Sequence, residues 1–285
     1  MKVALYYCNE DNFGDQLNIP ILKHYGFDSH LARPIDSDIS GIGSILGCLG
    51  PKFRGLVYGS GLISADQCFD ARNAKVLALR GRLTQDRVTN AGCSVLGDPG
   101  LLVSRVYSQY KGREPIYELG IVPHYTEIED YQYIIKNMKD SLSRVSLIDV
   151  RDHCKNVIAS ITLCKAIATS SLHGMIVADA FAIPVCWLTP SSKIEGGEFK
   201  FHDYLSSMEL KRSPRSLSKR HFFELACNNL TVAPQDKVLC IQQELETVLK
   251  SLSNHIVMSR IKRYPINNLH KVYRMVMRSK ESFKF

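Results

Sequence analysis

The chain has 285 residues, of which 45% are hydrophobic and 22% charged, and its formal net charge is +8. This composition is typical of a globular protein and excludes a disordered or collagen-like chain. No run approaches the roughly 18 consecutive apolar residues that a transmembrane helix needs, and the length suits two ordinary domains.

The N-terminus and the cysteines indicate a cytoplasmic protein. The apolar run Val3–Tyr7 is too short for the core of a signal peptide, and no small-residue cleavage site follows it. The nine cysteines form no Cys-x-x-Cys pair and no Cys/His spacing suited to zinc. We therefore expect reduced cysteines and no metal site.

The positive charge is concentrated at the C-terminal end. The segment Arg260–Phe285 contains eight basic residues and one acidic residue, so the rest of the chain is nearly neutral. This distribution argues against a nucleic-acid-binding domain and favours a tail that contacts an anionic surface.

The first half alternates short apolar strands with helices, a pattern that predicts a parallel sheet with covered faces. The expected strands are Val3–Tyr7, Leu56–Tyr58, Lys75–Leu79 and Ser94–Leu96, and the expected helices are Gln16–His24 and residues 82–88. A polar segment, Ser104–Glu118, contains Gly112 and Pro115 and reads as a linker between domains.

A second alternating run follows the linker. Its expected strands are Leu119–Val122, Ser146–Val150, Ala166–Thr169 and Pro184–Leu188, and its expected helices are Glu127–Leu142, Asp152–Cys164 and Gly174–Phe181. Beyond Ser213 the pattern is helical, with His221–Asn229, Gln235–Leu252 and a helix from Ile256 to the end, where Leu269–Met277 has an apolar stripe. We expect two Rossmann-like α/β domains, residues 1–112 and 113–215, and a basic helical extension, residues 216–285.

The strand-to-helix turns are the candidate ligand sites, because open α/β sheets bind ligands beyond the carboxyl ends of their strands. The turn with Ser170, Ser171 and His173 precedes the helix that starts near Gly174. Free backbone N–H groups and the positive end of the helix dipole favour an anion there. His173 is a candidate anion ligand or general acid, whereas the plainer alternative is a capping serine beside an ordinary histidine.

Other turns carry further candidates, each with a plain structural alternative. His124 ends a strand of the second sheet, and Asp15 is either a helix cap or a base that accepts a proton from a sugar hydroxyl. Arg80 directly follows a strand and could bind a carboxylate or phosphate or stay exposed. Lys200 belongs to a segment that reads as a flexible, glycine-hinged loop able to close on an anion, or as a solvated loop.

Weaker signals complete the set. Gly59, Ser60 and Gly61 would let backbone approach a ligand closely, although glycines in turns are common. No GxGxxG, Walker A, GxSxG or HExxH pattern occurs, so the usual support for dinucleotide, P-loop, hydrolase and zinc-protease sites is missing.

Taken in order, seven motifs resemble the series of the polysaccharide pyruvyl transferase family. They are NFGDQLN, VYGSG, LRGRLT, LGDPGLL, VPHY, SSLHGMIVADAFAIPVCW and KFHDYLSS. The resemblance covers about Met1 to Ser207, and the SSLHG segment with its downstream Ile-Pro is the most specific part. It is closest to the exopolysaccharide ketal-pyruvate branch, because Ser171 stands where many family members have an arginine two residues before the histidine.

The resemblance implies a GT-B-like pair of Rossmann domains with the active site between them. It also implies transfer of a pyruvyl ketal group from phosphoenolpyruvate to a sugar of a bacterial surface polysaccharide or its lipid-linked repeat unit, without a cofactor. His173 would be the acid or phosphate ligand and Asp15 the weaker candidate for the acceptor base. The remaining expected residues are Ser170, Ser171, Leu172, Gly174, His124, Lys200 and Arg80 for the donor, and Asn12, Gly14, Asn18, Gly59, Ser60 and Gly61 for the acceptor.

Two rival functions stay open at this point. A GT-B glycosyltransferase that uses a nucleotide sugar would share the layout and the anion-binding helix start, and a non-catalytic sugar-binding protein of polysaccharide assembly would share the fold. The basic tail has two interpretations as well. It could pack on the first domain, as is usual for GT-B-like proteins, with peripheral contact to the inner face of the cytoplasmic membrane as the lesser hypothesis.

Overall fold

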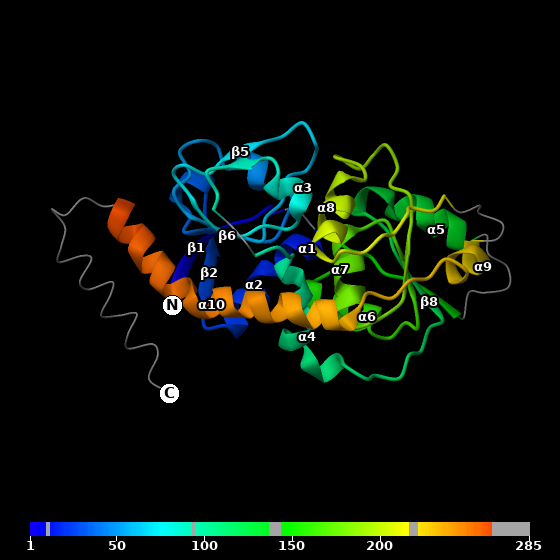
Figure 1. Ribbon diagram of the computed structural model, residues 1–285. Helices are drawn as coiled ribbons and strands as arrows, with labels where there is room; N and C mark the ends of the chain where they lie inside the picture. Colours follow the sequence, from blue (N-terminus) through cyan, green and yellow to red (C-terminus); the bar gives the residue numbers. More distant parts are fainter. Residues whose placement is uncertain (10–11, 93–94, 137–143, 217–221, 264–285) are drawn as a thin grey trace.

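The computed structural model of the chain describes residues 1–9, 12–92, 95–136, 144–216 and 222–263. Two parallel sheets lie side by side, one built from each half of the sequence (Figure 1). The first sheet has the order β2-β1-β3-β4-β6. Its strands are β1 (Lys2–Tyr6), β2 (Asp28–Leu31), β3 (Ile39–Ser40), β4 (Leu56–Tyr58) and β6 (Lys75–Ala78).

The second sheet has the order β11-β10-β8-β9, and a separate pair is formed by β5 (Phe69–Asp70) and β7 (Val88–Thr89). The strands of the second sheet are β8 (Leu119–Val122), β9 (Val145–Leu147), β10 (Ile167–Thr169) and β11 (Val185–Trp187). Every pairing in both sheets is parallel. The central strands β4, β8 and β10 are buried along their whole length, as expected for strands covered on both faces.

Both sheets share one feature of topology. In each, the first strand in sequence pairs with the second on one side and with the third on the other. The chain therefore reverses its direction of winding between β1 and β3, and again between β8 and β10. Such switch points leave a crevice beyond the carboxyl ends of the strands.

Helices cover the sheets and join them. They are α1 (Phe13–Gln16), α2 (Asn18–His24), α3 (Arg82–Gln85), α4 (Val103–Val106), α5 (Ile128–Lys136), α6 (Cys154–Ile161), α7 (Leu172–Ala180), α8 (Phe199–Ser207), α9 (Phe222–Cys227) and α10 (Gln235–Arg263), and the 3-10 turns are η1 (Pro34–Asp36), η2 (Leu46–Cys48), η3 (Pro99–Leu102), η4 (Ser108–Tyr110) and η5 (Tyr125–Glu127). One core cluster contains side chains from both halves, including Leu17, Leu101 and Ile176. The two sheets thus share buried apolar surface.

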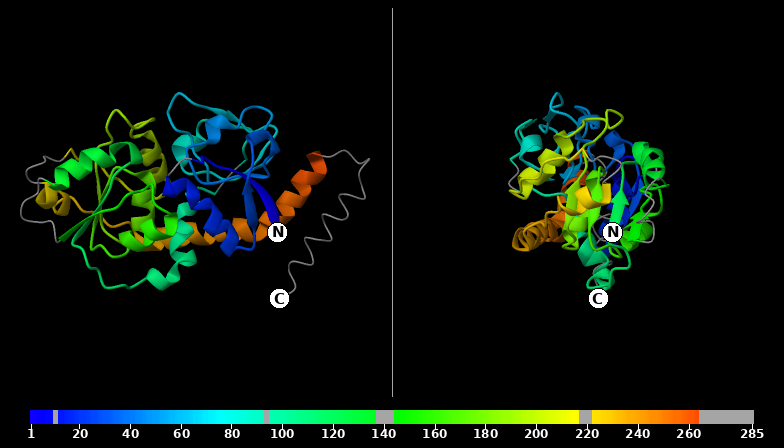
Figure 2. Two further views of the ribbon diagram at one scale, coloured as in Figure 1. Left: turned by 180° about the vertical axis from the view of Figure 1, so that it is seen from behind. Right: turned by 90° about the vertical axis from the view of Figure 1, so that its right-hand side faces the viewer.

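Helix α10 runs along one side of the molecule beneath both sheets (Figures 1 and 2). Two tyrosines of the first half bond to its middle: the Tyr58 hydroxyl donates to the Leu245 carbonyl (3.0 Å) and the Tyr25 hydroxyl to Glu246 (2.7 Å). Near its end, Arg260 forms an ion pair with Asp38 (2.5 Å). Up to Arg263 the C-terminal extension therefore packs back on the first half. No described helix is long and apolar enough to cross a membrane.

The structure corrects several sequence predictions. The strand expected at Ser94–Leu96 is reduced, within the described residues, to a single bridge between Leu79 and Leu96. The expected helices Gln235–Leu252 and Ile256 onward are one continuous helix. The loop expected around Lys200 is the helix α8. The apolar stripe Leu269–Met277 lies outside the described residues, and the domain boundaries at 112 and 215 stay predictions.

Candidate active site

A cavity of about 370 Å³ lies where the two switch points meet. The turns that follow β1, β3 and β4 line it from the first half, and the segments that follow β8, β10 and β11 line it from the second. Its lining residues are Cys8, Asn12, Asp15, Ser44, Ile45, Cys48, Ile63, Gln67, His124, Tyr125, Ser171, Leu172, His173, Lys193, Glu195 and Lys200. This is the location at which doubly wound sheets bind their ligands.

The start of α7 lies at the cavity, and the turn before it is the one that the sequence predicts as a ligand site. Ser171 is the N-cap residue of α7, and its hydroxyl accepts a hydrogen bond from the Gly174 N–H (3.4 Å). Glycine is needed at position 174, because a Cβ atom there would lie 2.6 Å from Thr169 Oγ1 and 2.9 Å from Val122 Cγ1. The helix can therefore pack closely on the sheet with its N-terminus at the cavity. Gly174 contributes to the site by this packing and does not line it.

His173 lies one residue into α7 and is only 6% exposed. Gly14 of α1 packs directly against its ring, since a Cβ at Gly14 would lie 2.0 Å from Nδ1. Burial, together with the positive charges of Arg80 and Lys200, lowers the pKa of His173 to about 3. The imidazole is therefore neutral in the free protein.

Asp98 faces His173 from the first half of the chain. Its Oδ2 lies 3.9 Å from His173 Nε2, and neither atom has a hydrogen-bond partner among the described residues. Asp98 caps η3 through its other oxygen, which accepts from the Gly100 N–H (2.8 Å). Burial raises the pKa of Asp98 to about 6. The sequence analysis quoted the motif LGDPGLL without assigning this aspartate a role.

Lys200 reaches the cavity from α8 and is 8% exposed. Burial, and next the charge of Arg80, lowers the pKa of its ammonium group to about 8, although Asp15 and Glu195 act in the opposite direction. A bound anion would be attracted by the buried Lys200 ammonium and would in turn favour the charged form of this group. Ionisable groups with such shifted pKa values are typical of functional sites.

Arg80 is buried and does not line the cavity. Its guanidinium donates to Asp203 Oδ2 (2.8 Å), to Ser44 Oγ (2.6 Å) and to the Leu62 carbonyl (2.6 Å). The alternative of an exposed arginine is thus wrong, and donor binding by Arg80 stays a prediction. Arg80 pairs with a carboxylate of α8, and it touches the cavity through Ser44.

Asp203 joins α8 to the first half, where α3 and α8 lie side by side (Figure 1). Besides Arg80, it accepts hydrogen bonds from the backbone N–H (2.8 Å) and the hydroxyl (2.6 Å) of Thr84. The Arg82 N–H donates to Ser206, one turn further along α8 (2.8 Å). The helix that carries Lys200 is therefore fixed to the opposite half of the molecule.

His124 and Ser170 are held by a glutamate that sequence reasoning missed. The Glu127 carboxylate is 3% exposed and accepts from the Ser170 hydroxyl (2.5 Å) and from the Ser191 N–H (2.8 Å). Ser170 in turn accepts from the His124 N–H (3.1 Å). Burial, and then Lys200, lowers the pKa of His124 to about 4, so both imidazoles at the cavity are neutral.

The residues expected on the acceptor side divide into two groups. Asn12 lines the cavity, accepts from the Gly14 N–H (3.2 Å) and donates to Asp15 Oδ2 (3.2 Å). Asp15 lines it too and is 7% exposed. Asn18 instead bonds to the backbone of Ile42. Gly59, Ser60 and Gly61 are buried behind the cavity wall, where the Ser60 hydroxyl bonds to the Gly41 carbonyl.

Residues 56–192 match the family model described as polysaccharide pyruvyl transferase. This match spans slightly less than half of the chain. The chain is 28% identical over 221 residues to the succinoglycan biosynthesis protein ExoV of Rhizobium meliloti, an alignment that covers 75% of this chain and 67% of that protein.

Two further similarities are more limited. The uncharacterized protein L143 of Acanthamoeba polyphaga mimivirus is 33% identical over 139 residues, so the alignment spans 48% of this chain and less than half, 46%, of that relative. A solved structure of an uncharacterized protein from Klebsiella pneumoniae has a TM-score of 0.43 and 15% identity, covering 76% of this chain and 92% of the other. A likeness of this degree carries no information about the site.

The resemblance to the family raises the question of which cation replaces the arginine that many of its members have at the position of Ser171. Lys200, His124 and Arg80 are the candidates for a replacement cation. Lys200 and His124 line the cavity, whereas the Arg80 guanidinium does not. Lys200 is the one that carries charge at neutral pH, since the pKa of His124 is about 4. No group of metal-ligating residues occurs in the described part of the chain.

Proposed function

We propose that this protein transfers a pyruvyl ketal group from phosphoenolpyruvate to a sugar of a surface polysaccharide or its lipid-linked repeat unit. The observation that carries the proposal is the cavity between the two switch points, which combines His173, Lys200 and the N-terminus of α7. Two sheets of the same strand order that open onto one cavity also support the GT-B-like arrangement.

Phosphoenolpyruvate suits this cavity because it carries a phosphate and a carboxylate. The first-turn amides of α7 and the Lys200 ammonium would bind these anionic groups. A dianion beside His173 would raise the pKa of the imidazole from its low value in the free protein, because an opposite charge favours the charged form. The bound donor would thus create the acid that protonates it.

The transfer then proceeds by protonation of the donor, addition of a sugar hydroxyl and loss of phosphate. The acid protonates the methylene carbon of phosphoenolpyruvate, leaving an oxocarbenium-like carbon next to the carboxylate. A sugar hydroxyl adds to that carbon and gives its proton to a base, for which Asp15 is the candidate. The carbon–oxygen bond to phosphate then breaks and its electron pair stays with the phosphate. A second hydroxyl of the same sugar adds to the carbon and closes the ketal, and its proton passes to the departing phosphate, which leaves as hydrogen phosphate. The proton held by Asp15 returns through solvent to the acid.

Inorganic phosphate release is the decisive assay. The purified protein is incubated with phosphoenolpyruvate and candidate saccharide acceptors, phosphate is measured, and the glycans are analysed by mass spectrometry for a pyruvyl increment. His173→Ala should abolish release, while His30→Ala, at an exposed histidine of β2, should leave it unchanged. Stabilisation by uridine diphosphate sugars but not by phosphoenolpyruvate, in thermal-shift measurements, would instead support the glycosyltransferase alternative.

The basic tail extends the proposal to the membrane. Several basic residues near an anionic leaflet contribute roughly 1 kcal/mol each, and lipid-linked acceptors are membrane-bound. We therefore propose peripheral contact of the C-terminal end with the inner face of the cytoplasmic membrane. Deletion of Pro265–Phe285 should weaken co-sedimentation with anionic vesicles, and unchanged co-sedimentation would remove this part of the proposal.

A further inference from the structure

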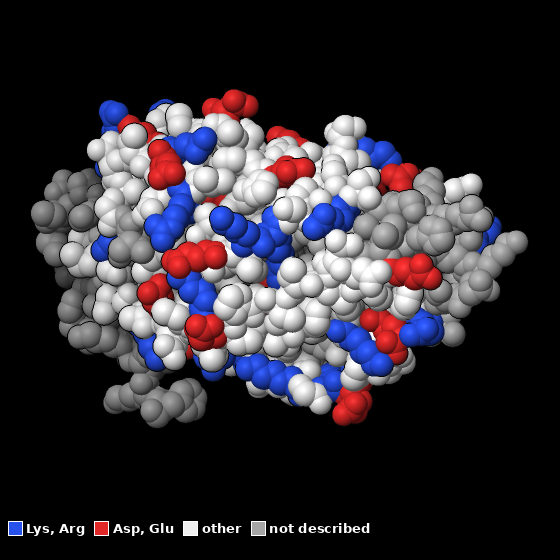
Figure 3. Space-filling model, turned by 45° about the vertical axis from the view of Figure 1, so that its right-hand side comes forward, with Lys and Arg blue, Asp and Glu red and all other residues white. Residues whose placement is uncertain are grey.

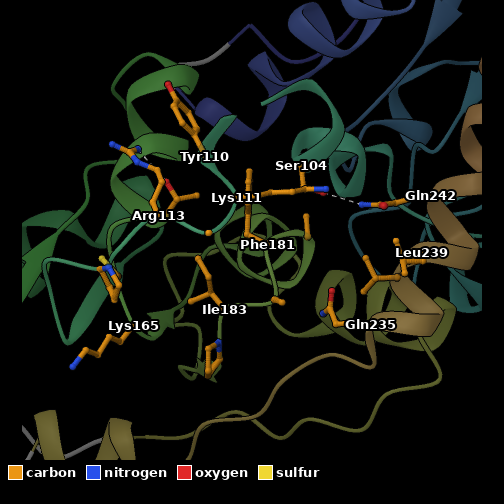
Figure 4. Close-up of a pocket in the computed structure, with 18 residues that line it drawn as sticks. Ser104, Tyr110, Lys111, Arg113, Lys165, Phe181, Ile183, Gln235, Leu239 and Gln242 are labelled. Atoms are coloured by element: carbon orange, nitrogen blue, oxygen red, sulfur yellow. Dashed lines mark hydrogen bonds between the residues drawn. The ribbon is translucent and has the colours of Figure 1, made fainter. Parts of the chain in front are cut away.

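A second cavity, of about 540 Å³, does not belong to the candidate active site. It lies at the amino ends of the strands of the second sheet, at the edge opposite to the candidate active site. There the linker after η4 and the C-terminal ends of α6 and α7 meet the beginning of α10 (Figure 4). This volume is within the range of pockets that bind small molecules.

Apolar side chains line two sides of this cavity. Phe181 and Ile183 form one side, and Val238 and Leu239 of α10 form the other. Leu239 is 45% exposed in the free protein. An apolar ligand body would remove this side chain from water.

The polar groups of the walls are already bonded within the protein. The Gln242 amide donates to the Leu101 carbonyl (2.7 Å) and to Ser104 Oγ (3.0 Å), and Figure 4 draws the bond to Ser104. The Gln235 amide donates to the Ala233 carbonyl (3.0 Å). These groups are thus satisfied without a ligand, and the interior offers mainly carbon surface.

The rim is positively charged. Lys111, Arg113 and Lys165 line the cavity, and no aspartate or glutamate of the described residues does. Lys165 is neutralised by Glu118 (2.6 Å), whereas no carboxylate among residues 1–263 that the structure describes pairs with Lys111 or Arg113. Arg113 is held in place over the Tyr110 ring, 4.9 Å from its centroid. An anionic group at this rim would meet two cations that have no carboxylate partner among the described residues.

We propose that this cavity binds one molecule of an amphipathic anion, with an apolar body between Phe181 and Leu239 and a phosphate or carboxylate head at Lys111 and Arg113. The site is separate from the proposed transferase site, although α7 connects them: His173 lies at its start, and the cavity wall begins at its end. The ligand is a single dissolved amphiphile, and its binding does not require a membrane surface.

Isothermal titration with three probes tests the proposal: octyl phosphate below its micelle concentration, 1-octanol and inorganic phosphate. Octyl phosphate should bind with one-to-one stoichiometry and at least about tenfold more tightly than either of the others, because only it has both parts. Equal binding of 1-octanol would remove the role of the cations. Equal binding of inorganic phosphate would remove the role of the apolar walls.

Variants locate the binding. Leu239→Asp and the double variant Lys111→Glu/Arg113→Glu change exposed side chains, so the fold should persist, and each should weaken octyl phosphate by about tenfold. Lys52→Glu, at an exposed lysine that lines neither cavity, is the charge-reversal control and should bind like the unmodified protein. Unchanged affinity in both cavity variants would overturn the proposal. The readout is binding alone, so it does not depend on pyruvyl transfer.

Discussion

At the scale of single residues, the charge of Lys200 decides how the site responds to pH. The pKa of this ammonium is about 8, so it is charged below that pH and neutral above it. Affinity for phosphoenolpyruvate should therefore fall as the pH rises through about 8, and Lys200→Met should remove this dependence along with most of the affinity. Titrations of the donor between pH 6.5 and 9.5 measure it, and an unchanged pH profile in Lys200→Met would contradict the assignment.

Binding of the donor should raise the pKa of His173, which burial lowers. Its pKa is about 3 in the free protein because burial and two nearby cations oppose the imidazolium, and a bound dianion should raise it. Nitrogen chemical shifts of the His173 ring should indicate the neutral form without ligand and move toward the protonated form when phosphoenolpyruvate is added. The exposed His30 serves as an internal control whose shifts should not change.

The sequence located several of these residues but not their partners. Strand-to-helix turns are recognisable locally, so His124, Asp15 and Ser171 could be predicted at the carboxyl edge of a sheet, and the structure brings them to one cavity. Asp98 and Glu127 were missed because their importance depends on contacts with His173 and Ser170. Such pairings between distant segments arise only from tertiary structure.

At the scale of elements, α8 should depend on its link to the first half. Asp203→Ala would leave the buried Arg80 guanidinium without its carboxylate, and breaking a buried ion pair typically costs about 3–5 kcal/mol. Chemical denaturation should show a loss of this order. Asp86→Ala, which removes an exposed aspartate after α3, should change the free energy of unfolding by less than about 0.5 kcal/mol. Equal stability of the two variants would contradict the proposed link.

The elements differ in how far local sequence determines them. The apolar strands Leu56–Tyr58 and Leu119–Val122 were predicted with their observed bounds, because buried parallel strands appear as uninterrupted apolar runs. The edge strand β2, with the sequence DSHL, is largely exposed and gives no such signal. Helix α8 was missed because the Gly196–Gly197 pair suggested a loop, yet both glycines adopt positive φ and lead into the helix.

At the scale of the whole molecule, the two halves are coupled. They share one apolar core cluster, and Asp203 and α10 connect them by polar contacts and packing. Local periodicity predicted two sheets and a C-terminal helix, but it contains no information on how the sheets face each other. That arrangement follows from the buried faces of α1, α7 and α10, which neither half could cover alone.

This coupling predicts that the two halves unfold together. Leu245 is fully buried on α10, against Gly97 and Tyr58 of the first half, and Leu→Ala at such a position costs about 2–5 kcal/mol. Trp187, the only tryptophan of the chain, lies in β11 of the second half. Leu245→Ala should therefore shift the denaturation curve followed by Trp187 fluorescence, although the two side chains belong to different halves. Leu239→Ala, at a half-exposed leucine of the same helix, should shift it far less. A Trp187 transition unaffected by Leu245→Ala would mean that the sheets unfold independently.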